Sequence, residues 1–144
     1  MKNIIRNFIY LPVMILFVAC SSNDDNPGPG NSTEVSNALK SGTWKITYFW
    51  DTDKDETGNF TGYNFTFGEN GSLAATNGVN TYNGSWNTVT DDSHVKLNIN
   101  FNAPEEFVDI SEDWHVIEQS STKIKLEDVS GGNGGTDYLH FEKN

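Results

Sequence analysis

The sequence has little with which to cross-link a fold or to hold nucleic acid. It contains one cysteine, Cys20, so an internal disulfide cannot form. Its only arginine and both of its methionines fall within the first 19 residues. Twenty acidic residues oppose nine basic ones, which gives a formal net charge of −11. Because a phosphate backbone repels such a surface, the sequence predicts no nucleic-acid partner.

The sequence also lacks an apolar run that could span a membrane, since a spanning helix needs about 20 apolar residues. Residues 1–19 instead have the parts of a secretory signal peptide, because Lys2 and Arg6 precede an uncharged stretch of 13 residues. Residues 17–20, Phe-Val-Ala-Cys, resemble the lipobox of bacterial lipoproteins, in which the cysteine after the cleavage site carries diacylglycerol. The resemblance implies lipidation of Cys20 and a membrane as a partner, whereas the alternative is a plain secreted protein with a free thiol.

Residues 20–32, which begin with the acylated cysteine, are polar and rich in proline and glycine, and this composition predicts a flexible tether. Asp24 and Asp25 resemble the export signal of surface-displayed lipoproteins in some Gram-negative bacteria. Ser21, directly after Cys20, resembles the pattern for release to the outer membrane. Together these features predict a lipid-anchored protein of the outer membrane, exposed at the cell surface, with a single folded domain over residues 33–144.

The folded part shows a period of two in its apolar residues. In residues 95–101, for example, Val, Leu, Ile and Phe alternate with Lys and Asn, as in a strand with one wet face. Turn signals such as Asn70-Gly71 and Asn77-Gly78 separate similar segments. We expect eight strands, near 43–50, 61–68, 72–77, 80–88, 94–101, 113–119, 122–128 and 136–142, with one helical turn within 103–113. This predicts an all-β fold, an eight-stranded antiparallel up-and-down barrel, with an antiparallel β-sandwich as the alternative.

The phase of the first strand predicts which of its side chains enter the barrel. Trp44, Ile46, Tyr48 and Trp50 share one face by alternation, so we expect Tyr48 and Trp50 to point inward beside Trp44. The other rings expected inside are Tyr63, Phe65, Phe67, Tyr82, Trp86, Phe101, Trp114 and Phe141. The interior is therefore small and rich in aromatic side chains.

A family resemblance supports the barrel. Gly42-Thr43-Trp44 is similar to the glycine-x-tryptophan opening of lipocalin and related calycin barrels, and Gly84-Ser85-Trp86 repeats the pattern. With the closing segment 138–143, the chain resembles the lipocalin-like domains of bacterial surface lipoproteins. The resemblance implies a barrel that binds a small apolar or amphipathic ligand.

Residues near the strand ends are the candidates for contact with such a ligand. Trp50, Phe60 and Tyr63 offer aromatic faces to a flat apolar molecule or a sugar ring, and Asn59 and Asn64 offer hydrogen bonds. The alternative is a filled barrel that serves as a structural or interaction module, docking on a surface protein complex or an extracellular polymer. The state of the interior, empty or packed, distinguishes the two hypotheses.

Carboxylates and histidines provide weaker candidates. Asp51, Asp53 and Asp55 stand at alternate positions, as in calcium loops, but an EF-hand would need glycine at Glu56 and glutamate at Gly62. An acidic loop is therefore the preferred interpretation. The second acidic group, which could supply an acid and a base for sugar hydrolysis, consists of Glu105, Glu106, Asp109, Glu112 and Asp113.

No constellation in the sequence predicts an enzyme or a cofactor. His94, His115 and His140 are far apart, and we expect the last two to point outward from strands, as surface side chains and not as metal ligands. No serine lies in a nucleophile elbow, and the lipobox accounts for the only cysteine. The sequence thus favours a non-enzymatic binding or interaction protein.

Overall fold

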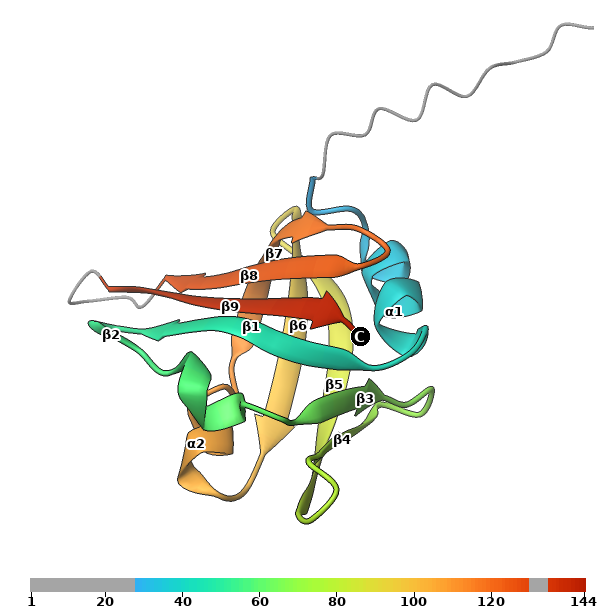
Figure 1. Ribbon diagram of the computed structural model, residues 1–144. Helices are drawn as coiled ribbons and strands as arrows, with labels where there is room; N and C mark the ends of the chain where they lie inside the picture. The colour runs from blue at the N-terminus through green and yellow to red at the C-terminus, as the bar shows by residue number, and fades with distance from the viewer. Residues whose placement is uncertain (1–27, 130–134) are drawn as a thin grey trace, which may run out of the picture.

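A computed structural model describes residues 28–129 and 135–144, which form one barrel with short helical segments (Figure 1). The predicted leader, Cys20 and the pair Asp24 and Asp25 lie outside the described residues. In chain order the elements are α1 (Ser32–Lys40), β1 (Trp44–Asp51), β2 (Lys54–Asp55), the 3-10 turn η1 (Thr57–Phe60), β3 (Asn64–Phe67), β4 (Ser72–Thr76), β5 (Thr81–Asp91), β6 (His94–Phe101), α2 (Glu105–Val108), β7 (Asp113–Gln119), β8 (Lys123–Val129) and β9 (Thr136–Lys143).

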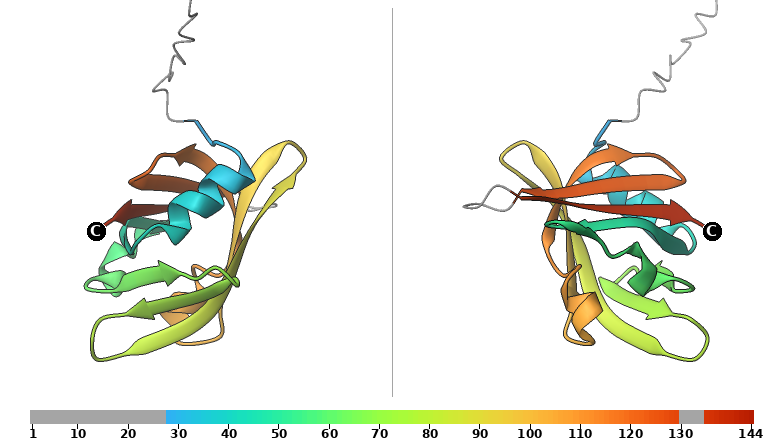
Figure 2. Two further views of the ribbon diagram at one scale, coloured as in Figure 1. Left: turned by 90° about the vertical axis from the view of Figure 1, so that its right-hand side faces the viewer. Right: turned by 60° about the vertical axis from the view of Figure 1, so that its left-hand side comes forward.

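The strands form a closed antiparallel meander. From β3 to β9 each strand pairs with the next in sequence, and β1 closes the sheet by pairing with both β9 and β3. The two-residue strand β2 only extends the end of β1. The views in Figure 2 show the sheet curving around on itself, with α1 packed against β3 and β5. The predicted eight-stranded up-and-down barrel is confirmed, and the sandwich alternative is wrong.

Alternation along the strands places the core. In β6, for example, Val95, Leu97, Ile99 and Phe101 are buried while the side chains between them face outward. All the buried apolar side chains of the barrel and its helices belong to one cluster. At about 0.8 kcal/mol for each buried CH₂ group, this cluster is the main source of the barrel's stability.

The first strand departs from the predicted phase. Its register against β9 shifts between Ile46 and Tyr48, an irregularity of the β-bulge type. Past the shift, Phe49 is buried and the flanking Tyr48 and Trp50 are only half-buried. The prediction that Tyr48 and Trp50 point inward is therefore wrong, because one extra residue reverses the facing of every side chain after it.

Helix α1 was not predicted, and it begins within the expected tether. Asn31 caps it through a capping box, in which the Asn31 side chain accepts from the Glu34 N–H at 3.0 Å and the Glu34 carboxylate accepts from the Asn31 N–H at 3.0 Å. Before it, the Gly28 carbonyl accepts a hydrogen bond from the backbone of Gln119 at the end of β7, 2.8 Å away. The folded domain therefore includes Gly28–Ser32, which the sequence assigned to the tether.

Helix α1 closes one end of the barrel. Its buried residues Val35, Ala38 and Leu39 join the core, and the Trp44 indole N–H donates to the Leu39 carbonyl at 2.9 Å. The opposite end carries η1 and α2, the second of which confirms the helical turn expected within 103–113. Both ends of the barrel are thus covered by helical segments of the chain itself.

Candidate functional site

The interior, where a lipocalin-like ligand would be expected, is occupied by the protein's own rings. Phe141 contacts Phe65 and Phe67 at centroid distances of 5.4 and 5.6 Å, and Phe67 meets Trp86 edge-on at 5.3 Å. Pairs at this spacing are in direct contact and add to the energy of burial. The predicted inward positions Trp44, Phe65, Phe67, Trp86, Phe101, Trp114 and Phe141 are all confirmed as core.

Phe107 of α2 closes the end of the barrel opposite α1. Its ring lies within 4.9 to 5.3 Å of the rings of Tyr82, Tyr63, Phe101 and Phe60. Phe107 is 2% exposed, although only four residues make up its helix. The sequence gives no signal that places Phe107 in the core, since a single apolar ring in an acidic loop segment has no periodicity to reveal it.

The predicted ligand contacts at this end are divided between core and surface. Phe60 is buried, and its ring fills the interior between Phe49, Phe65 and Phe107. Tyr63 is half-buried against the same Phe107. Asn59 and Asn64 are exposed, and Asn64 accepts a hydrogen bond from the Asn144 side chain at 2.7 Å. The structure therefore does not bring Asn59, Phe60 and Asn64 to one open pocket.

Trp50, the remaining candidate, lies on the outer face of the sheet. It is the Cα partner of Asp55 on β2 and of Tyr138 on β9, and Tyr138 is in turn the partner of Glu127 on β8. Residues directly opposite on neighbouring strands project from the same face. Asp55, Trp50, Tyr138 and Glu127 thus form a row of carboxylate, ring, ring and carboxylate across four strands, which we call the outer row.

A second line of side chains runs parallel to the outer row. Tyr48 faces His140 across β1 and β9, with ring centroids 4.9 Å apart, and His140 faces Lys125 on β8. Lys125 is bound to Glu118 at 2.6 Å. Burial, and then the charges of Lys125 and Lys123, lower the pKa of His140.

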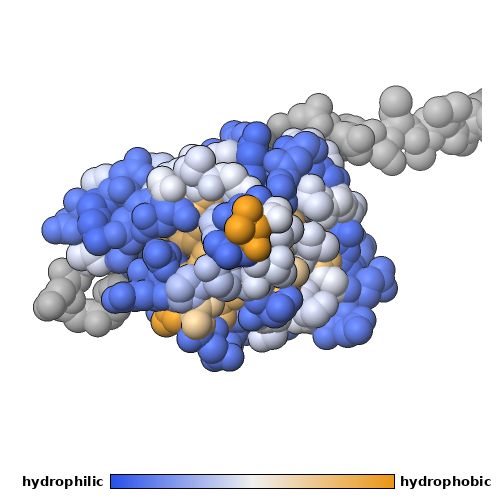
Figure 3. All heavy atoms as spheres, turned by 60° about the horizontal axis from the view of Figure 1, so that its bottom comes forward, coloured by the Kyte–Doolittle hydropathy of each residue, from blue (hydrophilic) through white to orange (hydrophobic). Residues whose placement is uncertain are grey.

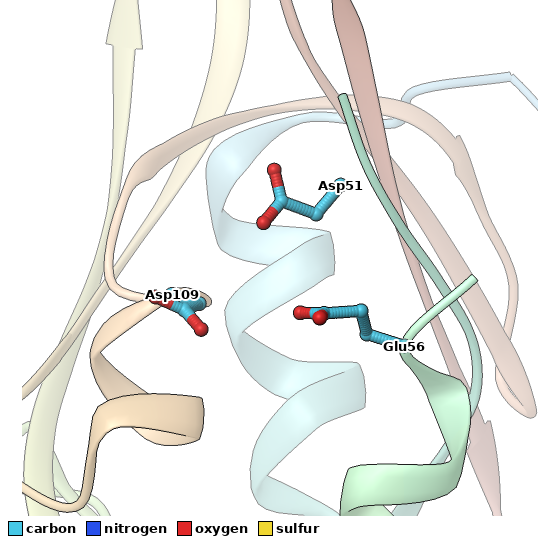
Figure 4. A group of neighbouring side chains, drawn as sticks. All are labelled: Asp51, Glu56 and Asp109. Atoms are coloured by element: carbon cyan, nitrogen blue, oxygen red, sulfur yellow. The ribbon is translucent and has the colours of Figure 1, made fainter. Parts of the chain in front are cut away.

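Three carboxylates meet at the end of the barrel that carries η1 and α2, as Figure 4 shows. Asp51 ends β1, Glu56 precedes η1 and Asp109 follows α2, and their oxygens lie within 4.8 Å of one another. We call them the carboxylate cluster. The predicted calcium triplet is not assembled as such, since Asp53 and Asp55 are exposed elsewhere in the turn and Asp55 accepts from the Thr57 N–H at 2.9 Å.

The three carboxylates of the carboxylate cluster repel one another, and one lysine partly neutralises their charge. Burial, followed by the charges of Glu56 and Asp51, raises the pKa of Asp109. Lys54 forms an ion pair with Glu56. With one oxygen from each carboxylate, the cluster offers three of the six to eight oxygens that coordinate Ca²⁺. One of the three, Glu56, is already paired with the Lys54 ammonium.

The second predicted acidic group is not gathered into one site. Glu105 and Glu106 are exposed on α2, and Asp113 binds Lys96 at 2.9 Å. Burial raises the pKa of Glu112, with smaller contributions from Asp128, Asp113 and Asp137. These carboxylates surround the same end of the barrel as the carboxylate cluster, so that end is acidic, without a paired acid and base.

The histidines take surface positions. His94 and His115 stack on the outer face of β6 and β7, with ring centroids 5.2 Å apart and planes inclined by 10°. His140 lies between the inward Leu139 and Phe141 and therefore faces outward, as predicted, although it is half-buried. Among the described residues the groups that could hold a metal comprise the carboxylate cluster and no histidine.

One shallow hollow lies beside α1. It has a volume of about 240 Å³ and opens to solvent. Its lining is mostly polar and consists of Ser36, Glu69, Gly71, Trp86, Asn87 and Thr88. Trp86 is itself 6% exposed and donates its indole N–H to the Gly68 carbonyl, so little of its ring faces the hollow.

Comparison with known proteins gives the fold alone. Among solved structures the chain is similar to a DUF4847 family protein from Bacteroides vulgatus, at 19% identity and a TM-score of 0.53, over 76% of this chain and 97% of that one. No family model matches the chain, and no curated protein does. None of the helices within residues 28–129 and 135–144 is long and apolar enough to cross a membrane. The closed antiparallel barrel and this structural likeness together fit a calycin-like fold.

Proposed function

We propose that the protein is a non-enzymatic, lipid-anchored binding module that acts through the outside of a filled barrel. The observation that carries this proposal is the packed interior, in which Phe141 contacts both Phe65 and Phe67 and α1 and α2 cover the ends. An eight-stranded barrel is just wide enough either for its own side chains or for one small ligand. Here the side chains take the space.

The competing function is the one that the lipocalin resemblance implies, the binding of a small apolar or amphipathic molecule within the barrel. It would require Phe107 to move away from Phe60 and Tyr63, and its ring contacts both of theirs. Displacing buried rings costs several kcal/mol. The filled barrel therefore supports the interaction module over the ligand carrier.

The proposed location rests on the sequence. The leader 1–19, the lipobox ending at Cys20, and Asp24 and Asp25 support a lipid-anchored protein at the surface of the outer membrane. Gly28 is hydrogen-bonded to the end of β7, and only residues 21–27 lie between it and Cys20 in the sequence. A short connection would hold the barrel close to the membrane.

Two measurements test this function. The native mass of the purified full chain, recorded with and without an apolar fluorescent probe, should show neither a bound small molecule nor uptake of the probe. A bound mass that is lost on denaturation would contradict the filled barrel. Labelled palmitate should be incorporated in the host and should be lost in Cys20→Ser, and continued labelling of that variant would contradict the anchor.

A further inference from the structure

The outer row has the chemistry of a receptor for positive charge. Its two rings, Trp50 and Tyr138, lie on neighbouring strands and are half-buried, so part of each ring faces solvent. The face of an aromatic ring is negative and attracts ammonium and guanidinium groups within about 6 Å. The molecule contains one such contact already, because the Lys143 ammonium lies 5.7 Å from the centre of the Trp44 ring.

The row is flanked by negative charge on both sides. Asp55, which also accepts a hydrogen bond from the Thr57 N–H, is next to Trp50. At the other end Glu127 is next to Tyr138, and His115 on β7 lies beyond it. Neighbouring strands lie about 4.8 Å apart, so the two carboxylates are separated by roughly 14 Å with both rings between them. The nearest lysine of the parallel line, Lys125, is bound to Glu118 and offers little opposing charge.

The whole molecule reinforces this local charge. The chain carries a net charge of −11, and the acidic end of the barrel, with Asp51 and Asp109, adjoins the outer row. Such a field repels phosphate, anionic lipid and acidic polysaccharide, and it steers cations toward the surface. Carboxylates beside aromatic rings match a cationic group better than a neutral sugar, which needs both donors and acceptors.

We propose that the outer row binds lysine or arginine side chains carried by an extended segment of a partner protein. This inference rests on the proposed function, because it gives the interaction module a surface and its partner a chemistry. A cationic side chain would lie over Trp50 or Tyr138, and its neighbours would pair with Asp55 and Glu127. The β-bulge in β1 makes the site, since without it Trp50 would point into the barrel.

The test uses the full chain, purified in detergent, and a seven-residue peptide that alternates arginine with glycine. Trp50 is a built-in reporter, since Trp44, Trp86 and Trp114 are buried. We expect the peptide to change the tryptophan fluorescence, and we expect binding measured by calorimetry to weaken about fivefold in Trp50→Ala. Glu127→Gln should weaken it by a similar or smaller factor, and added salt should weaken it further.

Matched variants separate a site from general charge attraction. Glu69→Gln removes the same charge from the exposed turn between β3 and β4, and Val79→Ala removes an exposed apolar side chain from the turn between β4 and β5. Both should bind the peptide like the unchanged chain. Equal weakening in Glu69→Gln and Glu127→Gln, or no weakening in Trp50→Ala, would overturn the proposal.

The same variants would also reveal a ligand of a different class. Trp50-dependent binding of the neutral glucan laminarin, or of vesicles of phosphatidylethanolamine and phosphatidylglycerol, without binding of the arginine peptide would overturn the proposal in favour of that ligand. These outcomes leave the filled barrel intact. A different result, uptake of an apolar probe into the interior, would contradict the proposed function.

Discussion

Individual carboxylates at one end of the barrel differ in what their neighbours do to them. Asp109 faces Glu56 and Asp51 and follows the last residue of α2, where negative charge is unfavourable for a helix. Asp113, four residues later, binds Lys96 at 2.9 Å. Burial, then other carboxylates, raises the pKa of Asp109, whereas hydrogen bonding to Lys96 lowers the pKa of Asp113. The two aspartates therefore make opposite contributions to stability.

We expect Asp109→Asn to raise the melting temperature at neutral pH. Because the pKa of Asp109 is above its usual value of 3.8, the folded chain binds more protons than the unfolded chain between that value and the raised pKa. The stability contributed by this group therefore falls as the pH rises through that window. The increase in melting temperature in Asp109→Asn should shrink as the pH falls toward 3.8, because the Asp109 carboxyl of the unchanged chain then becomes neutral. Thermal melts followed by circular dichroism across this range measure it.

Asp113→Asn is the matched control, and it should have the opposite sign. Its lowered pKa gives stability that is present above the usual value of 3.8 and is lost as the pH falls through the folded pKa. This variant should melt at a lower temperature at neutral pH. The same sign of change in both variants would show that the geometry around Asp109 is not that of crowded carboxylates.

Among the elements, α2 has an effect out of proportion to its length. Its four residues place Phe107 among four other rings, while the neighbouring Val108 is 44% exposed. The face of the molecule in Figure 3, which includes the side toward α2, is mostly hydrophilic with small separate hydrophobic areas. One face of this short turn is thus committed to the core, and the other remains in solvent.

Phe107→Ala should lower the free energy of unfolding by about 3 to 5 kcal/mol, as expected for a buried ring that leaves a cavity. Val108→Ala, at the adjacent exposed position, should change it by less than about 0.5 kcal/mol. Urea denaturation of both variants provides the measurement. A loss of less than about 1 kcal/mol in Phe107→Ala would mean that the end of the barrel is open, contrary to the filled interior.

The elements also show what could be predicted from the sequence. Strands with strict alternation, such as β6 and β8, were predicted to within a residue or two because each buries one face. The side chains of β1 that face inward were not predicted correctly, because the bulge depends on the register against β9, which is nearly a hundred residues away. Helix α1 was missed because its buried residues number only three, while the Asn31 capping box with Glu34 was a signal that could have revealed it.

The candidate sites were likewise predictable from the sequence only in part. The sequence identified Trp50 and Asp51 as noteworthy residues, but their companions, Tyr138 and Asp109, come from other strands or helices. Phe60 and Asn64 were assigned to one ligand site by nearness in sequence, and the structure separates them into core and surface. Cross-strand neighbours are set by register and closure, which a single sequence does not display.

For the whole molecule, the dominant electrostatic property is unbalanced charge. With a net charge of −11, the folded chain repels itself, and compact states suffer from this more than expanded ones. Raising NaCl from about 20 mM to about 300 mM shortens the screening length and should raise the melting temperature by a few degrees. Melting curves at both salt concentrations measure it. A fall in melting temperature would mean that ion pairs such as Lys96–Asp113 outweigh the repulsion.

The closure of the barrel by β1 and β9 also determines when folding can finish. Trp44 pairs with Lys143, so the contact that seals the sheet joins the first strand to nearly the last residue. Ribosomal synthesis delivers these partners in order, and no partial chain that lacks β9 can complete the sheet. Long-range pairing of this kind is kinetically slow, because the loop-closure entropy must be lost before the contacts form. The protein should therefore pass through any translocation channel as an unfolded chain, and its native state should appear only after β9 has emerged.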